Sequence, residues 1–189
     1  MKKQILAKNE RLRADASKLL QKLDLVRLLE KNGWVKFTGS YAANLMNRSD
    51  IDVYVVGSWS REKVTRIFVS LLGQLRVKGL LFFDWVKYRH PDFPKAYYIG
   101  VKDNFRGEKW KIDIWFLTDP QVKALPFGSW EGLEVSDAQR ELIVRFKDYR
   151  DRHQLVIPSF RIYVAVLFER LGTIKEIRSY CLNQTKKRP

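Results

Sequence analysis

The spacing of hydrophobic and polar residues changes several times along the chain. Apolar residues recur at three- and four-residue steps over residues 8–31, which predicts a long N-terminal helix. The same spacing predicts a helix over residues 60–76, with Ser60 as its N-cap. Residues 34–38 and 51–56 lie outside these helices and are predicted to be short strands. The first part of the chain therefore alternates between helix and strand.

Three further strands are predicted over residues 80–87, 96–101 and 109–117. The last third is helical, since residues 136–139 and 173–176 each have the pattern of a capping box. The expected fold class is α+β, with a mixed sheet, flanking helices and a C-terminal helical part. Two domains are expected, a sheet-containing domain over residues 1–130 and a helical subdomain over residues 131–189.

The charge indicates the kind of partner. Lys and Arg number 36 against 21 acidic residues, which gives a net charge of +15. This excess favours a polyanionic partner such as nucleic acid, nucleotide phosphates or an acidic protein, although a basic surface without a specific partner is the simpler alternative. No apolar run reaches the ~18–20 residues that a membrane span needs. Cys181 is the only cysteine, so neither an internal disulfide nor a cysteine zinc site is expected, and a cytoplasmic location is predicted.

Two aspartates lie two residues apart at the start of the strand predicted over residues 51–56, Asp50 directly before it and Asp52 within it. Since side chains alternate between the faces of a strand, Asp50 and Asp52 point the same way, while Ile51 and Val53 point to the other face. Two carboxylates at close range repel each other and cannot be buried without compensation. A divalent cation resolves this conflict, and carboxylate oxygens are the ligands that magnesium prefers.

A third aspartate occupies a similar position in the strand over residues 109–117. Asp113 shares a face with Lys111 and Trp115, opposite to its apolar neighbours. If this strand lies beside that of Asp50 and Asp52, the three carboxylates converge, and three suffice to hold two metal ions ~3.5–4 Å apart. Lys111 is expected either to pair with Asp113 or to contact a substrate, and Trp115 either to stack on a base or to pack in the core.

Candidate phosphate-binding residues surround these acids in the sequence. Gly39 allows the backbone to approach a phosphate closely, and the hydroxyl of Ser40 can bind a phosphate oxygen. Arg48 and Ser49 precede Asp50 and are candidates for phosphate contact, with a plain loop role as the alternative. Lys63, near the start of a predicted helix, is a further candidate, with a solvated helix face as its alternative.

Together these motifs resemble the signature of the DNA polymerase beta-like nucleotidyltransferase superfamily. The signature is Gly39-Ser40, nine intervening residues, Asp50-x-Asp52 and a third acid, Asp113, on a later strand. The resemblance implies two magnesium ions, with Mn²⁺ as an alternative, and a nucleoside triphosphate such as ATP. It implies that Gly39 and Ser40 bind the triphosphate and that Asp50 and Asp52 bind both metals. It further implies that Asp113 binds one metal and activates the acceptor hydroxyl.

The resemblance covers roughly residues 34–117 and implies a nucleotidyltransferase palm. The implied activity is transfer of a nucleoside monophosphate from a triphosphate to an acceptor hydroxyl, with release of pyrophosphate. The positive charge favours the 3′ end of RNA or DNA as the acceptor. The short chain favours addition of one or a few nucleotides over processive synthesis.

Other interpretations stay open. One is AMP transfer to a protein, as in minimal antitoxin members of the superfamily, although those usually carry extra arginines where this chain has Asn44, Asn47 and only Arg48. Another is transfer to a small antibiotic, for which cationic aminoglycosides fit a basic protein poorly. The remaining alternatives are a fold relative without activity and a basic module that binds nucleic acid and a nucleotide without catalysis.

Overall fold

A five-stranded mixed sheet forms the centre of the protein, in the order β1-β2-β5-β4-β3. The computed structural model describes residues 2–91, 93–125 and 134–185, so the expected domain boundary at residue 130 lies outside the described residues. The strands are β1 (Trp34–Thr38), β2 (Asp50–Val56), β3 (Gly79–Asp84), β4 (Tyr97–Phe105) and β5 (Glu108–Leu117). Strand β2 pairs with β5 in parallel, and every other pair is antiparallel. The expected α+β class is confirmed.

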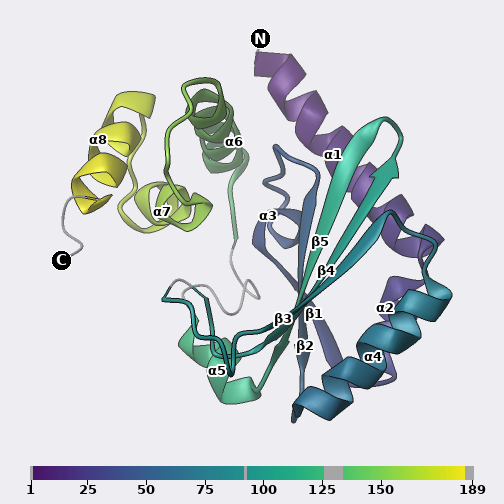
Figure 1. The fold of residues 1–189 in the computed structure, drawn as a ribbon. Coiled ribbons are helices and arrows are strands. Elements are labelled where there is room, and N and C mark those ends of the chain that lie inside the picture. The colour runs from purple at the N-terminus through teal and green to yellow at the C-terminus, as the bar shows by residue number, and fades with distance from the viewer. Residues whose placement is uncertain (1, 92, 126–133, 186–189) are drawn as a thin grey trace.

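Helices lie on both sides of this sheet. They are α1 (Lys2–Lys22), α2 (Leu25–Glu30), α3 (Gly39–Ala42), α4 (Arg61–Gln74), α5 (Asp119–Ala124), α6 (Asp137–Arg152), α7 (Ser159–Tyr163), the π-helix η1 (Val164–Phe168) and α8 (Ile174–Thr185). Figure 1 shows the sheet nearly edge-on, with α1, α2 and α4 on one side and α6, α7 and α8 on the other. Among the described residues, no helix is long and apolar enough to cross a membrane.

The apolar side chains of the strands explain which face is buried. Exposure alternates along β2, so that Ile51, Val53 and Val55 are buried while the residues between them are partly exposed. These three side chains belong to the main hydrophobic core, together with residues of α1, α2 and α4. The opposite face, which carries Asp50 and Asp52, is therefore left for polar chemistry.

The N-terminal helix differs from its prediction. A single helix was expected over residues 8–31, but the chain breaks into α1 and α2 at Asp24, which has a left-handed backbone with φ 49°. The carboxylate of Asp24 accepts a hydrogen bond from Arg27 in the first turn of α2. The break changes the direction of the chain and places Leu25 and Leu29 in the same core as α1. Apolar spacing alone does not reveal it, because the stripe continues through both helices.

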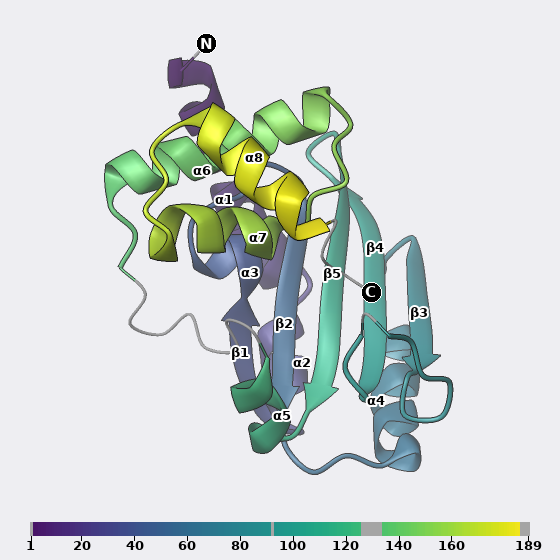
Figure 2. The same ribbon diagram turned by 90° about the vertical axis from the view of Figure 1, so that its left-hand side faces the viewer.

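The C-terminal helices have a hydrophobic cluster of their own, which includes Ile143, Phe146 and Ile177. Leu45, from the segment between α3 and β2, also belongs to this cluster. Figure 2 shows α6, α7 and α8 lying across the end of the sheet where α3 is found. This arrangement brings α6 and α7 close to the start of β2, where Asp50 lies.

Candidate active site

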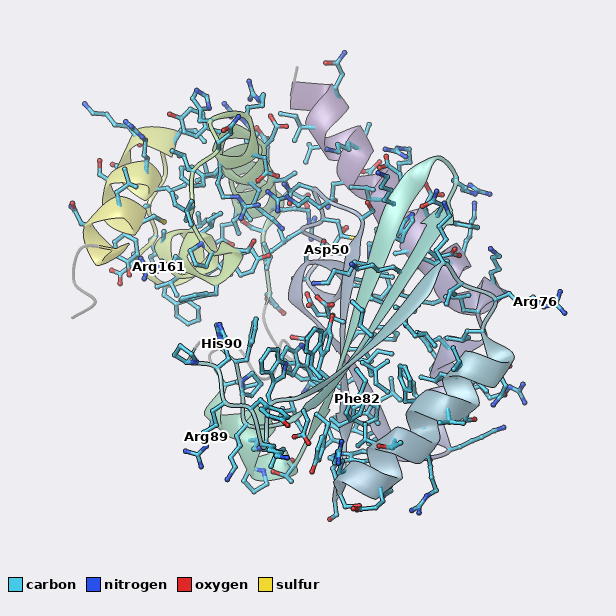
Figure 3. All side chains as sticks on the ribbon, in the orientation of Figure 1. Asp50, Arg76, Phe82, Arg89, His90 and Arg161 are labelled. Atoms are coloured by element: carbon cyan, nitrogen blue, oxygen red, sulfur yellow. The ribbon has the colours of Figure 1, made fainter. Side chains whose placement is uncertain are left out.

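The three predicted aspartates lie on one face of two neighbouring strands. In the parallel pairing of β2 with β5, Asp52 is directly opposite Asp113, and Asp50 is opposite Lys111. The expectation that the two strands are neighbours is confirmed. Figure 3 shows Asp50 on the side of the sheet that faces the C-terminal helices, whereas Phe82 lies on the side of α4. The acidic face is thus turned toward α6 and α7.

Asp50 and Asp52 line a cavity of about 290 Å³ together with Gly39 and Ser40. Gly39 has a φ of +64°, in the left-handed region that favours glycine. A Cβ atom at this position would overlap the carboxylate of Asp52. The glycine is therefore required twice, by its backbone conformation and by the close approach of the Asp52 side chain.

Ser40 has a buried side chain in the first turn of α3. Its hydroxyl oxygen has no hydrogen-bond partner among the described residues. A buried hydroxyl without a partner costs about 1–3 kcal/mol, so such groups are usually satisfied by a ligand or by ordered water. The orphaned oxygen, together with the open approach at Gly39, fits the binding of a phosphate group beside Asp52.

The electrostatics of the cavity favour a bound cation. Burial, and to a smaller extent the nearby carboxylates of Asp50 and Asp113, raise the pKa of Asp52 to about 7. Burial also raises the pKa of Asp50, against the opposing effect of the Lys147 ammonium. A divalent ion between Asp50 and Asp52 would supply the missing positive charge, since both are oxygen donors of the kind magnesium prefers.

A cationic wall from α6 and α7 closes the other side of the cavity, and sequence reasoning missed it. Lys147 is buried, and its Nζ donates to the carbonyl of Leu45 at 2.7 Å and to the hydroxyl of Tyr163 at 3.2 Å. Burial lowers the pKa of Lys147 to about 8, while the Asp50 carboxylate opposes this effect. The sequence did contain a signal for it, because Lys147 lies one turn after the buried Ile143 on α6, where an apolar residue is expected.

Arg150 lies one turn further along α6 and also lines the cavity. Its guanidinium donates to the carbonyl of Ile157 at 3.1 Å and to the hydroxyl of Ser159 at 3.0 Å, so it is fixed in place although it is buried. Phe160 lines the same cavity and is 39% exposed. The cavity therefore joins carboxylates on the sheet to two buried cations on α6 and one exposed ring on α7.

Arg48 and Ser49, the predicted phosphate contacts beside Asp50, are both engaged by other residues of the protein. Arg48 lines the cavity, but its guanidinium pairs with Asp151 of α6 at 2.6 Å. The Ser49 hydroxyl donates to the carbonyl of Lys109 at 2.9 Å, which ties β2 to β5.

Lys63 does not reach the site, contrary to the prediction. It follows the far end of β2, roughly 20 Å from Asp50 at ~3.3 Å per residue. There its ammonium lies over the ring of Trp59 at 4.5 Å and donates to the carbonyl of Ser58. The prediction failed because β2 carries the chain away from the acids before α4 begins.

Asp113 is held by its neighbours rather than by the other acids. Tyr98 donates to one carboxylate oxygen at 2.5 Å, and Lys111 pairs with the other at 2.8 Å. Gly100 is opposite Asp113 on β4, and a Cβ there would lie 2.6 Å from the Tyr98 hydroxyl, so this glycine leaves room for the contact. In the described parts of the chain, no group of three or more acidic, histidine or cysteine side chains is arranged to hold a metal ion. The two-ion site with Asp113 therefore stays a prediction.

Comparison with known proteins supports the fold. No protein-family model and no curated protein matches the sequence. A solved structure of a GLD-2/RNP-8 complex matches 100% of this chain and 74% of that chain, with a TM-score of 0.58 and 12% identity. A poly(A) polymerase complex of GLD-2 with GLD-3 matches 84% of this chain and 57% of that chain, with a TM-score of 0.48 and 14% identity. The first likeness shows a shared fold, which agrees with the fold expected from the resemblance to DNA polymerase beta-like nucleotidyltransferases.

Proposed function

We propose that the protein is a magnesium-dependent nucleotidyltransferase, which moves a nucleoside monophosphate from a triphosphate to an acceptor hydroxyl and releases pyrophosphate. The observation that carries this proposal is the cavity that joins Asp50 and Asp52 to Gly39-Ser40 and to the cations of α6. A site that only stabilised the fold would have little reason to bury carboxylates whose pKa is raised by their surroundings.

The two sides of the cavity have different roles in this proposal. Gly39 and the orphaned hydroxyl of Ser40 receive phosphate oxygens of the triphosphate beside Asp52. The buried cations Lys147 and Arg150 offset the remaining negative charge from the opposite wall. Phe160 lies at the same cavity with an exposed ring, which suits stacking on the base of the nucleotide. Helices α6 and α7 thus complete the nucleotide site.

Asp50 and Asp52 would hold the magnesium. The ion, when bound, supplies positive charge that lowers the pKa of the acceptor hydroxyl and stabilises the leaving pyrophosphate. Asp113 can join these ligands only after Lys111 releases its carboxylate, because that oxygen is paired at 2.8 Å. With its second oxygen held by Tyr98, Asp113 is kept beside Asp52 in a fixed orientation.

Nucleic acid is the favoured acceptor. The net charge of +15 provides the phosphate neutralisation from which nucleic-acid affinity arises. GLD-2, whose complex shares the fold, is described as a poly(A) polymerase, which supports an RNA 3′ end as the first acceptor to test. A protein or an antibiotic remains the alternative acceptor, and the cytoplasm the proposed location.

Labelled triphosphates test the proposal. The protein is incubated with magnesium and each α-labelled triphosphate, with total RNA, DNA oligonucleotides or cell lysate as the acceptor. Label is expected in the nucleic acid, and an Asp50→Ala, Asp52→Ala variant should transfer none. Label on a protein would contradict the nucleic-acid acceptor, and no label in any fraction would contradict the enzymatic function.

The second candidate is a module that binds a nucleotide and nucleic acid without catalysis. The observation that favours it is the pairing of Asp113 with Lys111, which leaves only two carboxylates at the cavity. Retained binding of triphosphate without transfer to any acceptor would support this candidate.

A further inference from the structure

A second cavity opens on the acidic face of the sheet, on the far side of Asp113 from Asp50. Its volume is about 390 Å³, and Asp113 lines it, whereas Asp50 and Asp52 line the first cavity. Five aromatic side chains from β3, β4, β5 and the segment between β3 and β4 form most of its wall: Phe83, Trp85, Phe93, Tyr98 and Trp115. Figure 3 shows His90, from the same segment, on the side of the sheet where Asp50 lies.

The rings form one continuous group, and two of them are exposed. Phe83 stacks on Trp85 with centroids 5.1 Å apart and planes 8° apart, and Phe93 joins Trp85 to Trp115 at 5.1 and 5.6 Å. Phe83 is 41% exposed and Phe93 is 44% exposed. Large apolar side chains that gather at a concave, exposed position commonly mark a binding site.

Positive charge borders these rings. Lys102 and Lys111 face each other across β4 and β5 and both line the cavity. Lys111 is 51% exposed while it pairs with Asp113. An occupant that suits this wall has a flat apolar surface for the rings and a negative group for the two lysines. A nucleotide of a single strand has both, since its base presents a flat face and its phosphate an anion.

The position of Asp113 distinguishes this cavity from the nucleotide site. Asp113 is opposite Asp52 across β2 and β5, so the two cavities meet at this pair of acids. A group bound among the rings could place a hydroxyl beside Asp113 while a triphosphate lies beside Asp52. The arrangement suits two substrates that meet at the acids.

We propose that the aromatic cavity binds the 3′-terminal nucleoside of a single-stranded nucleic-acid acceptor. The base stacks on Phe83 and Phe93, and the phosphate that precedes it contacts Lys102 and Lys111. The phosphate thereby competes with Asp113 for Lys111, so that acceptor binding frees a carboxylate oxygen. The use of this nucleoside as the acceptor rests on the function proposed above, whereas its binding does not.

Binding without catalysis tests this proposal. Fluorescence anisotropy of a 5′-labelled single-stranded oligonucleotide is measured without triphosphate or metal, so the result is independent of transfer. Because stacking on an aromatic side chain is worth about 1–3 kcal/mol per base, a Phe83→Leu, Phe93→Leu variant should bind about tenfold more weakly or worse. Trp34→Leu is the matched control, since Trp34 is 57% exposed on β1 at the opposite edge of the sheet. It should bind like the wild type.

A change in the ligand gives a second measurement that needs no variant. An oligonucleotide whose 3′-terminal residue is abasic should bind the wild type about tenfold more weakly than the intact strand, whereas an abasic residue at the 5′ end should have little effect. Equal binding of the intact and 3′-abasic strands would overturn the proposal, as would wild-type affinity of the double variant. Absence of oligonucleotide binding to the wild type would overturn it too, even if label is transferred to a protein. Conversely, binding that depends on the 3′-terminal base, without any transfer, would support the proposed role of the aromatic cavity and refute the enzymatic function.

Discussion

The substitution Asp52→Asn should affect the stability of the fold and the activity of the site in opposite directions. The substitution keeps the size of the side chain and removes its charge in a cavity where burial raises the pKa of Asp52 from 3.8 to about 7. One pKa unit corresponds to about 1.4 kcal/mol, so ionised Asp52 destabilises the metal-free fold by about 4 kcal/mol at high pH. The variant should therefore be more stable than the wild type in the absence of metal, although it should be inactive.

The sign of the pH dependence follows from the direction of the shift. Since the pKa in the folded chain is raised above its value in the unfolded chain, the stabilisation by protonated Asp52 is complete at low pH and is lost as the pH rises through about 7. Proton linkage gives a loss of about 2–3 kcal/mol between about pH 5 and about pH 8 for the wild type. This contribution should be missing in the variant.

Denaturant unfolding at both pH values, with and without magnesium, measures these differences. Magnesium should recover stability in the wild type at the higher pH, because an ion that binds only the folded chain stabilises it by mass action. It should have little effect on the variant. Equal pH dependence of the two proteins would refute the idea that ionised Asp52 destabilises the metal-free fold. Equal stabilisation by magnesium would refute the idea that Asp52 binds the ion.

Two further variants probe the rest of the site, and a third tests Lys63, which lies outside it. Gly39→Ala should cost about 1–2 kcal/mol in denaturant unfolding and abolish label transfer, because an alanine Cβ strains the left-handed backbone and displaces Asp52; normal transfer would contradict this role. Lys147→Met should weaken binding of a non-hydrolysable triphosphate about tenfold in titration calorimetry, since it removes a buried charge from the wall of the proposed triphosphate site; unchanged affinity would remove Lys147 from the site. Lys63→Ala should change neither triphosphate affinity nor transfer, because its ammonium lies over Trp59; a loss of either would restore the sequence prediction.

Local patterns made much of the fold predictable. The short strand predicted over residues 34–38 is β1, and alternation predicted the shared face of Asp50 and Asp52. The N-cap at Ser60 is confirmed by its hydrogen bond from Lys63. The turn at Asp24 was missed because a single left-handed residue does not interrupt an apolar stripe. Helix α5 was not predicted, although the capping box of Thr118 and Gln121 that starts it directly follows the strand predicted over residues 109–117.

The candidate site was predictable only in part, because five of the thirteen residues that line the cavity come from distant positions in α6 and α7. Gly39 and the first two aspartates are close in sequence, so their spacing carried the motif. Lys147 and Arg150 reach the cavity only through the packing of α6 against the segment that holds Leu45. No local pattern predicts such packing, although a lysine within an apolar stripe marks a position that deserves testing.

The fate of the α-phosphate tests the central claim most directly. Wild-type protein is incubated with magnesium, a single-stranded RNA oligonucleotide and ATP labelled at either the α- or the γ-phosphate. Nucleotidyl transfer predicts that the α-label enters the oligonucleotide, that the γ-label leaves as pyrophosphate, and that Asp52→Asn abolishes both. Transfer of the γ-label to the oligonucleotide, or α-label transfer that survives the Asp52→Asn substitution, would contradict the account.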